Sequence, residues 1–264
     1  MIRVGIIGGG FVGSATALLA SEKIQTVVFD IDPKRCVPSS TTFTDVCKTD
    51  VIFICVPTPI TLPDGRCNTS MVANVIQQLR DYNYQGQVIV RSTVPVGFCE
   101  SYGVMFMPEF LTERDWKNTF LNTNCWIFGI DNPTPNQTSL CENLIKYSNV
   151  PNKDFEFVST KQAEYIKYVR NCFLALKVGF FNEVYHFAKA HGLNYNECIP
   201  LITVDPRIGQ SHTQVPGHDG KFGFGGTCFP KDIASLVYQM NTMNVPAPIL
   251  NAAQDRNNKI DRLD

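Results

Sequence analysis

The stretch GFGGTCFPKD at residues 223–232 combines a thiol with neighbours that could make it reactive. Glycines precede Cys228, while Pro230 and Asp232 favour the start of a helix directly after it. A thiol at a helix N-terminus beside Lys231 is expected to have a lowered pKa and more thiolate at neutral pH. The glycines would let a ligand approach the backbone closely. These features predict a nucleophile, since a buried structural cysteine would not need such neighbours.

A second candidate site lies at the N-terminus, where an apolar run leads into glycines and then into a helical pattern, RVGIIGGGFVGSATALLASE. Gly8, Gly10 and Gly13 match the Gly-x-Gly-x-x-Gly pattern of dinucleotide-binding turns. The first glycine allows a tight turn, the second lets backbone amides approach a pyrophosphate, and the third lets the helix pack close to the strand. The helix N-terminus favours the phosphate charge.

The next apolar run ends at Asp30, a position that favours NAD as the cofactor. A carboxylate at the end of the second strand accepts hydrogen bonds from a ribose 2′-hydroxyl and repels a 2′-phosphate. Lys34 and Arg35 weaken this preference for NAD over NADP, because they could neutralise an extra phosphate.

Apolar runs continue to alternate with helical patterns along residues 1–158, which are predicted to form the NAD-binding domain. Strands are expected near 51–56, 87–91, 104–107 and 125–129, and helices near 69–81 and 137–147. Asn68 is expected to cap a helix that begins at Thr69. This alternation predicts an α/β fold, a Rossmann-type doubly wound parallel sheet with helices on both faces.

Three segments follow predicted strands: PTP at 57–59, STVPVG at 92–97 and PEFLTE at 108–113. Ligands bind at the carboxyl ends of the strands in such sheets, so these segments are candidate ligand contacts. Each of them, taken singly, also fits an ordinary proline turn.

From about Lys161 the pattern changes to one long helix closed by Gly192, and residues 159–264 are predicted to form a mainly α-helical domain. Its apolar residues form two stripes, Ile166, Val169, Phe173, Leu176 and Phe180 on one and Leu174, Val178, Phe181 and Val184 on the other. A helix that is apolar on so much of its circumference needs cover on several sides. We therefore expect a homodimer packed through residues 161–190.

Lys167 and Asn171 lie one turn apart on this helix, and their line continues into Leu174 and Val178. An arbitrary polar pair of this kind would usually lie on a solvated face. The apolar continuation instead indicates a partly buried place, and a buried lysine needs an acidic partner or a substrate oxygen.

The composition excludes several classes of partner. A formal charge of −1 gives no general attraction for nucleic acid, and no segment approaches the roughly 20 apolar residues that span a membrane. The N-terminus reads as a strand and not as a signal peptide. The ten cysteines stand singly, without zinc-ligand spacing, so we expect no metal site and reduced, buried thiols, Cys228 excepted. The sequence thus predicts a cytoplasmic protein that binds a small molecule.

In order along the chain, these motifs resemble the nucleotide-sugar 6-dehydrogenases, the UDP-glucose and GDP-mannose dehydrogenase family. The matching elements are GIIGGGFVG, Asp30, VPTP, STVPVG, PEFLTE, AEYIKYVRN, DPRIG, FGGTCFPKD and ILNAAQDRNNK, which span nearly all 264 residues. The cysteine motif is the most specific of them. The resemblance implies a four-electron oxidation of the sugar C6 alcohol to a carboxylate, with two NAD per turnover. UDP-glucose is the first choice of substrate on family frequency.

The resemblance also implies a role for each candidate catalytic residue. Cys228 would trap the aldehyde as a thiohemiacetal, which a second oxidation converts to a thioester. Lys167 and Asn171 would stabilise the developing oxyanions. Asp232 and Thr93 would position the water or hydroxyl that passes protons, and Glu109 would support hydrolysis of the thioester.

The binding residues implied by the resemblance form two sets. The cofactor set is Gly8, Gly10, Phe11, Val12, Gly13, Asp30, Lys34, Pro57, Thr58 and Thr93. The substrate set is Glu109, Phe110, Leu111, Lys167, Asn171, Arg207, Phe222, Gly223, Gly225 and Cys228. Arg207 matches an arginine that faces the dimer partner's substrate, and the loop from His212 to Phe222 should pass the nucleotide. Glu113 also matches a family glutamate, but it fits equally well as a surface partner of Arg114 or Lys117.

Two alternatives follow from the length of the sequence, because family members usually continue for about another α/β domain, which closes over the sugar nucleotide. A two-electron β-hydroxyacid dehydrogenase has a related architecture and a Lys-x-x-x-Asn helix without that domain, but it has no need for Cys228. An inactive NAD-binding module that requires a separate chain is the other alternative. The intact candidate set argues against it.

Overall fold

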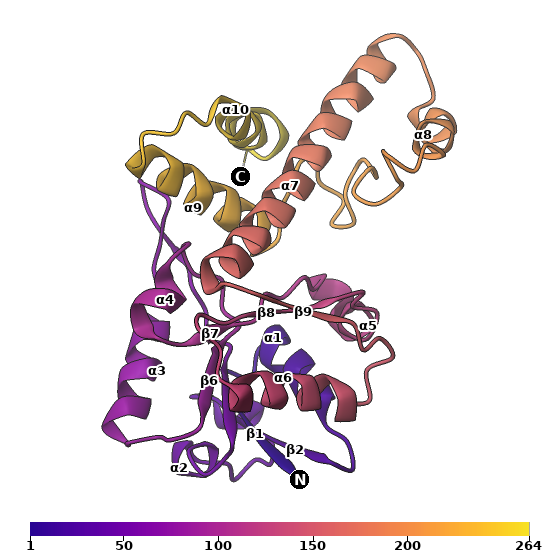
Figure 1. Ribbon diagram of the computed structural model, residues 1–264. Helices are drawn as coiled ribbons and strands as arrows, with labels where there is room; N and C mark the ends of the chain where they lie inside the picture. Colours follow the sequence, from indigo (N-terminus) through magenta and orange to yellow (C-terminus); the bar gives the residue numbers. More distant parts are fainter. Residues whose placement is uncertain (264) are drawn as a thin grey trace. The chain divides into compact units, whose positions relative to one another are not determined.

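The computed structural model describes residues 1–263, and the chain divides into two compact units (Figure 1). The first unit contains Met1–Pro59 and Cys67–Lys167, and the second contains Ile60–Arg66 and the chain from Tyr168 onward. The compact units therefore divide inside the long helix, nine residues beyond the predicted domain boundary at residue 158. The functional assignment of the two domains stays a prediction.

The first unit is built on a seven-stranded sheet with the order β2-β1-β3-β6-β7-β8-β9. The strands are β1 Ile2–Ile7, β2 Ile24–Phe29, β3 Val51–Ile54, β6 Gln87–Val90, β7 Met105–Phe106, β8 Trp126–Gly129 and β9 Phe155–Val158. The order reverses between β1 and β3, because β2 lies on one side of β1 and the later strands lie on the other. The carboxyl ends of β1 and β3 are thus the switch point at which such sheets bind ligands.

The sheet is not wholly parallel, which corrects the prediction. β8 runs antiparallel to β7, with Phe106 opposite Gly129, and β9 then runs parallel to β8. All four residues of β8 are buried, as are those of β3. A fully buried strand has the same apolar pattern in either direction, so the sequence carried no signal for this reversal.

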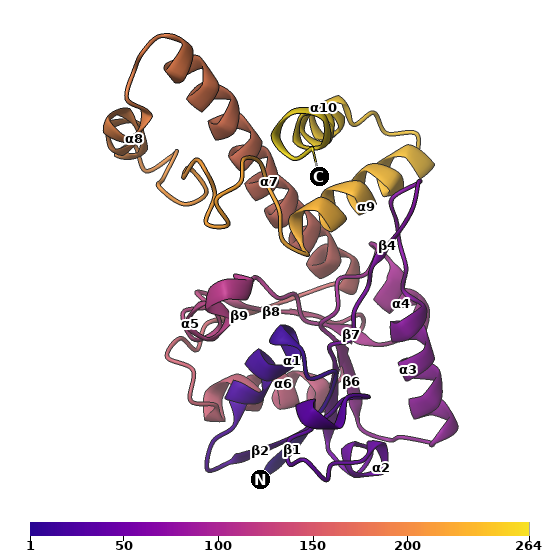
Figure 2. The ribbon, with the colours of Figure 1, turned by 180° about the vertical axis from the view of Figure 1, so that it is seen from behind.

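Helices cover both faces of the sheet (Figures 1 and 2). One face packs against α1 Phe11–Thr16, α5 Trp116–Leu121 and α6 Pro135–Tyr147. The other packs against α2 Phe43–Val46, α3 Ser70–Asp81, α4 Phe98–Tyr102 and the beginning of α7 Thr160–Ala190. Short 3₁₀ turns lie at Ala17–Leu19, Pro33–Arg35 and Glu113–Asp115. Each large apolar side chain buried between these layers contributes about 1.5–3 kcal/mol.

The helices begin where capping residues in the sequence predict, except that one helix starts one residue later than expected. α3 begins at Ser70, one residue later than predicted, and the Asn68 side chain accepts from the Ser70 amide over 3.0 Å. α6 begins with a capping box in which Thr134 and Gln137 satisfy each other's backbone amides. The predicted end of α7 is confirmed, since the helix stops at Ala190 and Gly192 has a φ of 69°.

The second unit is helical, apart from a short hairpin. It contains most of α7, α8 Tyr195–Thr203, α9 Phe229–Thr242, α10 Pro248–Arg256 and a π-helical turn at Asn257–Asp261. The hairpin of β4 Ile60–Thr61 and β5 Arg66–Cys67 follows β3 in sequence, yet residues 60–66 pack with this unit. At its tip Gly65 comes so close to α9 that a Cβ would lie 3.1 Å from the Ala234 carbonyl oxygen.

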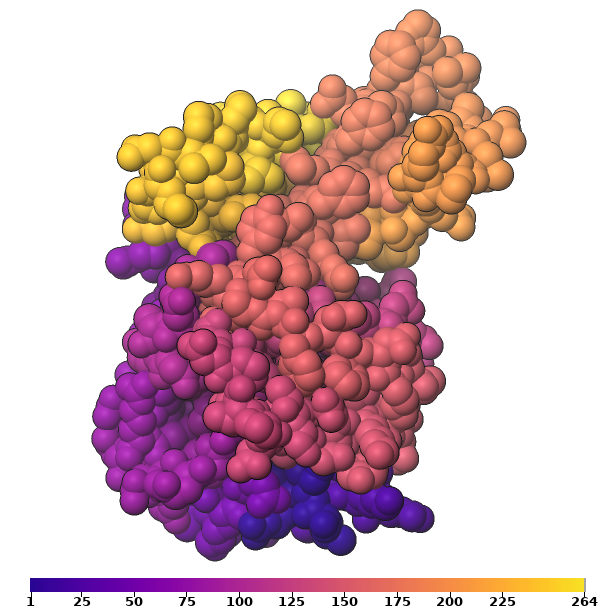
Figure 3. Space-filling model, in the orientation of Figure 1, coloured from indigo at the N-terminus to yellow at the C-terminus, as the bar shows by residue number. Residues whose placement is uncertain are grey.

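The two apolar stripes of α7 differ in burial. Phe181 is buried, and Val178 and Val184 pack against the clusters of the second unit. Phe173 and Phe180 on the other stripe are 62% and 61% exposed. Figure 3 shows atoms of α7 (salmon) at the surface along much of the helix. One chain therefore leaves one face of α7 uncovered.

All ten cysteines are free, and seven of them are buried. Cys125 and Cys198 are partly exposed, which corrects the expectation that every cysteine except Cys228 is buried. Within residues 1–263, no helix has the length and apolar character needed to cross a bilayer. The same residues contain no group of three or more His, Cys, Asp or Glu side chains that could bind a metal ion.

Candidate active site

The glycines of the turn between β1 and α1 differ in their surroundings: Gly8 and Gly13 are tightly packed, whereas Gly10 faces open space. A Cβ at Gly8, where φ is 102°, would lie 2.5 Å from the Cys55 carbonyl oxygen, and a Cβ at Gly13 would lie 1.8 Å from the Gly8 carbonyl oxygen. A Cβ at Gly10 would meet no atom within 4 Å. Gly10 precedes α1 without a side-chain cap, so backbone amides there are available to a phosphate.

Asp30 holds this turn from the end of β2. Its carboxylate accepts from the Gly9 amide over 2.6 Å and from the Asp32 amide over 2.8 Å. Lys34 and Arg35 lie in the following 3₁₀ turn, where Arg35 is engaged with Asp32. The carboxylate and the open glycine turn lie together at the switch point of the sheet, and this arrangement fits the ribose and pyrophosphate of NAD.

The other predicted cofactor residues lie at the same edge of the sheet. Phe11 is exposed at the start of α1, while Val12 packs against the core. Pro57 and Thr58 follow β3, the former exposed and the latter buried. Thr93 is buried after β6, and its carbonyl oxygen lies 3.6 Å from the Cys67 thiol.

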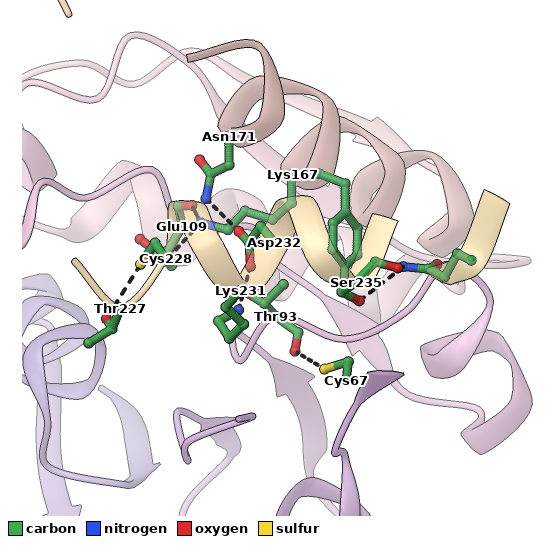
Figure 4. A network of polar contacts seen from close by, with 12 residues as sticks. Cys67, Thr93, Glu109, Lys167, Asn171, Thr227, Cys228, Lys231, Asp232 and Ser235 are labelled. Atoms are coloured by element: carbon green, nitrogen blue, oxygen red, sulfur yellow. Dashed lines mark hydrogen bonds and ion pairs between the residues drawn. The ribbon is translucent and has the colours of Figure 1, made fainter. Parts of the chain in front are cut away.

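Glu109 and Lys167 form a buried ion pair in the first unit (Figure 4). The Lys167 ammonium nitrogen lies 2.5 Å from Glu109 Oε1 and 2.5 Å from the Glu109 carbonyl oxygen. The other carboxylate oxygen accepts from the Leu111 amide over 2.8 Å, and the Phe110 ring centre lies 5.7 Å from the ammonium nitrogen. Lys167 is thus buried with the acidic partner that such a position requires.

The charge state of Glu109 reflects opposing effects. Burial raises its pKa, whereas the charge and hydrogen bond of Lys167, the Leu111 amide and the charge of Arg91 lower it. The lowering effects prevail, so the pKa lies below the ordinary value and the carboxylate is charged at neutral pH.

Asn171 and Asp232 form the corresponding polar contact in the second unit (Figure 4). The Asn171 side-chain amide donates to Asp232 Oδ2 over 2.6 Å, and both side chains are buried. Lys231 contacts the other oxygen of the same carboxylate. Asp232 lies in the first turn of α9, where a carboxylate is favoured by the helix dipole.

Cys228 immediately precedes α9 and is partly exposed. Its thiol lies 3.8 Å from the Thr227 hydroxyl (Figure 4). The helix begins at Phe229, so Pro230 occupies its second position and not the first position that proline prefers, and Lys231 pairs with Asp232. A lowered pKa of Cys228 therefore stays a prediction that rests on the helix N-terminus.

The glycines before Cys228 pack closely against residues of the C-terminal segment, which leaves no room for a side chain. A Cβ at Gly223, where φ is 68°, would lie 2.4 Å from the Asn257 side-chain oxygen. A Cβ at Gly225 would lie 2.5 Å from the guanidinium carbon of Arg262. The loop here is packed against the C-terminal segment, a physical reason for both glycines besides the predicted approach of a substrate.

The remaining predicted substrate residues belong to the second unit. The Arg207 guanidinium is exposed and pairs with Asp205 over 2.6 Å. Phe222 packs against the rings of Tyr185 and His186. Their roles toward a substrate stay predictions.

Glu164 is a buried carboxylate that the sequence analysis missed. It accepts from the amides of Gly97 over 2.5 Å and Cys99 over 2.8 Å, and it thereby ties the STVPVG segment to α7. The pKa of Glu164 is raised, chiefly by burial, although the two amides act to lower it. The signal available in the sequence was a glutamate three residues before Lys167 on the same helix.

Two family models match this chain. The model of the NAD binding domain of the UDP-glucose/GDP-mannose dehydrogenase family matches residues 37–147, and the model of the central domain of the same family matches residues 161–259. The chain belongs to the UDP-glucose/GDP-mannose dehydrogenase family. It is an NAD-dependent dehydrogenase of the class that acts on CH–OH groups, and the predicted family, fold and cofactor are confirmed.

Individual members of this dehydrogenase family are similar over most of the chain. The UDP-glucose 6-dehydrogenase of Campylobacter jejuni subsp. jejuni serotype O:2 is 29% identical over 97% of this chain and 72% of that protein. The structure of a UDP-glucose dehydrogenase from Pyrobaculum islandicum superimposes with a TM-score of 0.81 at 25% identity, over 96% of this chain and 67% of that one.

The fold is also shared with a protein of another name. A 3-hydroxyisobutyrate dehydrogenase structure from Mycobacterium tuberculosis superimposes with a TM-score of 0.71 at 17% identity, over 97% of this chain and 92% of that one. At this identity the likeness concerns the fold alone. The choice between these chemistries rests on the site residues.

Proposed function

We propose that this chain oxidises the C6 alcohol of a nucleotide sugar to the carboxylate, with UDP-glucose as the first substrate to test. The observation that carries the proposal is the partly exposed Cys228 at the start of α9, followed one turn later by the buried Asp232. A dehydrogenase that stops at two electrons has no use for a nucleophile at this position.

When bound, NAD would supply the hydride acceptor for each of the two oxidations. Within the first unit, the glycine turn and Asp30 hold the cofactor, and Lys167 donates a hydrogen bond to the oxygen that develops negative charge. Asn171, one turn further along α7, supports the same oxygen. The joint action of both units on one substrate is part of the proposal and rests on the family resemblance.

Cys228 divides the second oxidation into two chemical steps. Its thiolate adds to the aldehyde carbon, so that a C–S bond forms and the carbonyl π bond becomes an oxyanion. Oxidation of this thiohemiacetal at the same carbon, with a second NAD as the hydride acceptor, would give a thioester. Water attacks the thioester carbon, the C–S bond breaks, and the carboxylate leaves with the thiol regenerated. Asp232 and Thr93 position the proton-carrying water, and Glu109 supports the hydrolysis.

The test is the stoichiometry of NADH formation. UDP-glucose, UDP-N-acetyl sugars and GDP-mannose are offered to the wild type and to Cys228→Ser in parallel. The proposal expects two NADH per sugar acid from the wild type and a stalled reaction in the serine variant. A reliable value of one, with no thioester formed, would overturn it.

That outcome would favour the second candidate, a two-electron β-hydroxyacid dehydrogenase. The fold likeness to 3-hydroxyisobutyrate dehydrogenase and the Lys167–Asn171 spacing are the observations in its favour. If NAD binds and none of these substrates turns over, the chain is an NAD-binding module that requires another chain. Turnover on mixing with a third-domain protein would identify that case.

We further propose a homodimer packed through α7. Phe173, Phe180 and Phe187 lie at a spacing of seven residues, and all three are exposed in the single chain. Large exposed rings in line along one helix are typical of a helix that packs against another.

We also propose a cytoplasmic location for the protein, because ten free thiols suit a reducing compartment.

A further inference from the structure

Arg91 is a buried cation that the proposed chemistry does not use. It follows β6 and is 2% exposed. One guanidinium nitrogen donates to the Thr16 hydroxyl over 3.3 Å, and the Phe120 ring centre lies 5.6 Å from the guanidinium carbon. Its Nε is buried without a hydrogen-bond partner, and none of the carboxylates in residues 1–263 accepts a hydrogen bond from it. A buried cation in this state needs a compensating charge nearby.

The strand register places Glu109 close to Arg91 along the neighbouring strand. Val90 on β6 lies opposite Phe106 on β7, and the Met107 amide donates to the Val90 carbonyl over 2.9 Å. Arg91 is therefore level with Met107, two residues before Glu109 in the chain. Burial lowers the pKa of Arg91, whereas the Cys55 thiol after β3 and the Glu109 carboxylate raise it, and the Arg91 charge in turn lowers the pKa of Glu109.

Glu109 is thus influenced by two cations on different elements. Lys167, on α7, contacts it directly, whereas Arg91, after β6, acts from farther away. Under the proposed function Lys167 must also serve a substrate oxygen, which draws its ammonium away from the carboxylate. A buried carboxylate that loses its only cation takes up a proton. Arg91 has no role toward the substrate in the proposed chemistry.

We propose that Arg91 is a positioning residue of the active site, whose fixed buried charge holds Glu109 as a carboxylate while Lys167 engages the substrate. The role in turnover rests on the proposed function. The electrostatic coupling between Arg91 and Glu109 does not, so the two can be tested separately. A guanidinium that only fills space against Phe120 would have no effect on the ionisation of Glu109.

The test is a pH titration of the Glu109 side-chain carboxyl carbon by ¹³C NMR in glutamate-labelled protein, with Glu109→Gln used to assign the signal. Arg91→Gln is expected to move the Glu109 midpoint to higher pH, and Arg91→Lys, which keeps the charge, is expected to move it less. Arg66→Gln removes an exposed arginine and serves as the matched control. An Arg91→Gln midpoint equal to that of the wild type would overturn the proposal.

A second variant covers the case in which Arg91→Gln does not fold. In Lys167→Met the direct partner is absent and Arg91 remains, so Glu109 is expected to stay charged at neutral pH. A protonated Glu109 in Lys167→Met at pH 7 would equally overturn the proposal. Both measurements need no substrate, so they hold whether or not the chain oxidises a nucleotide sugar.

Discussion

At the scale of single residues, the buried ion pair of Glu109 and Lys167 is expected to contribute to the stability of the first unit. Breaking a buried pair by removing one partner costs about 3–5 kcal/mol, because the remaining charge loses its direct contact. We expect Lys167→Met to lower the free energy of unfolding in urea by about 3 kcal/mol. The double variant Lys167→Met/Glu109→Gln should recover much of that loss, because it also removes the carboxylate that has lost its direct partner. A single variant as stable as the wild type would contradict this account of the pair.

The same pair predicts a dependence of stability on pH. The pKa of Glu109 is lowered in the folded chain, so its contribution is present above the unfolded value and is lost as pH falls through the folded value. We expect the wild type to lose more unfolding free energy below about pH 4.5 than Glu109→Gln does. Parallel urea titrations at several acid pH values measure this difference. If the unfolding free energies of the wild type and Glu109→Gln fell equally at acid pH, the ion pair would not account for the pH dependence.

Cysteine reactivity tests the exposure of Cys228. Cys228, Cys125 and Cys198 are the three partly exposed cysteines. Of these three, only Cys228 is the residue that directly precedes a long helix, α9. We expect iodoacetamide to label Cys228 first at neutral pH, and Cys125 and Cys198 more slowly, with the buried thiols protected. Mass spectrometry of the folded protein at short times measures the order. Labelling of Cys198 ahead of Cys228 would argue against an activated thiol.

At the scale of elements, the turn between β1 and α1 divides its glycines between folding and binding. Gly13→Ala places a methyl group against the Gly8 carbonyl and is expected to lower the melting temperature by several degrees. Gly10→Ala has room for the methyl group and should leave the melting temperature near that of the wild type. It is nevertheless expected to weaken NAD binding about tenfold, roughly 1.4 kcal/mol, because the methyl group occupies the approach to the amides. Calorimetric titration with NAD distinguishes the two variants.

The loop before Cys228 is an element held from two sides. The amide of Gly223 donates to Asn182 on α7, and the amide of Phe224 donates to Asn257 in the C-terminal turn. We expect Gly223→Ala to destabilise the chain by more than about 1 kcal/mol, since φ is positive and the methyl group meets Asn257.

Gly220→Ala is the matched control for that loop. Gly220 has a positive φ of 75° but open space around it, so the variant carries the backbone strain alone. Urea unfolding should therefore show the larger loss for Gly223→Ala. Equal losses would mean that the contact with Asn257 contributes nothing.

At the scale of the whole molecule, the uncovered face of α7 is the surface on which the proposed homodimer depends. We expect Phe180→Asp to shift the protein from dimer to monomer in sedimentation experiments, because a carboxylate would be buried in the interface. Lys189→Asp, on an exposed polar position of the same helix, is the control and should leave the mass unchanged. A monomeric wild type at micromolar concentration would contradict the homodimer proposal.

The sequence by itself determined the family, the cofactor and most of the helices and strands. These follow from local signals: the spacing of glycines, the apolar periods, and the motifs around Asp30, Lys167 and Cys228. Tertiary structure alone decided the antiparallel direction of β8, the partner of Lys167 and the burial of Arg91 beside Thr16. Glu109 and Lys167 are 58 residues apart, so their pairing depends on how β7 and α7 pack. Local periodicity reports which face of an element is buried, whereas the neighbour of a buried side chain is set by packing between segments distant in the chain.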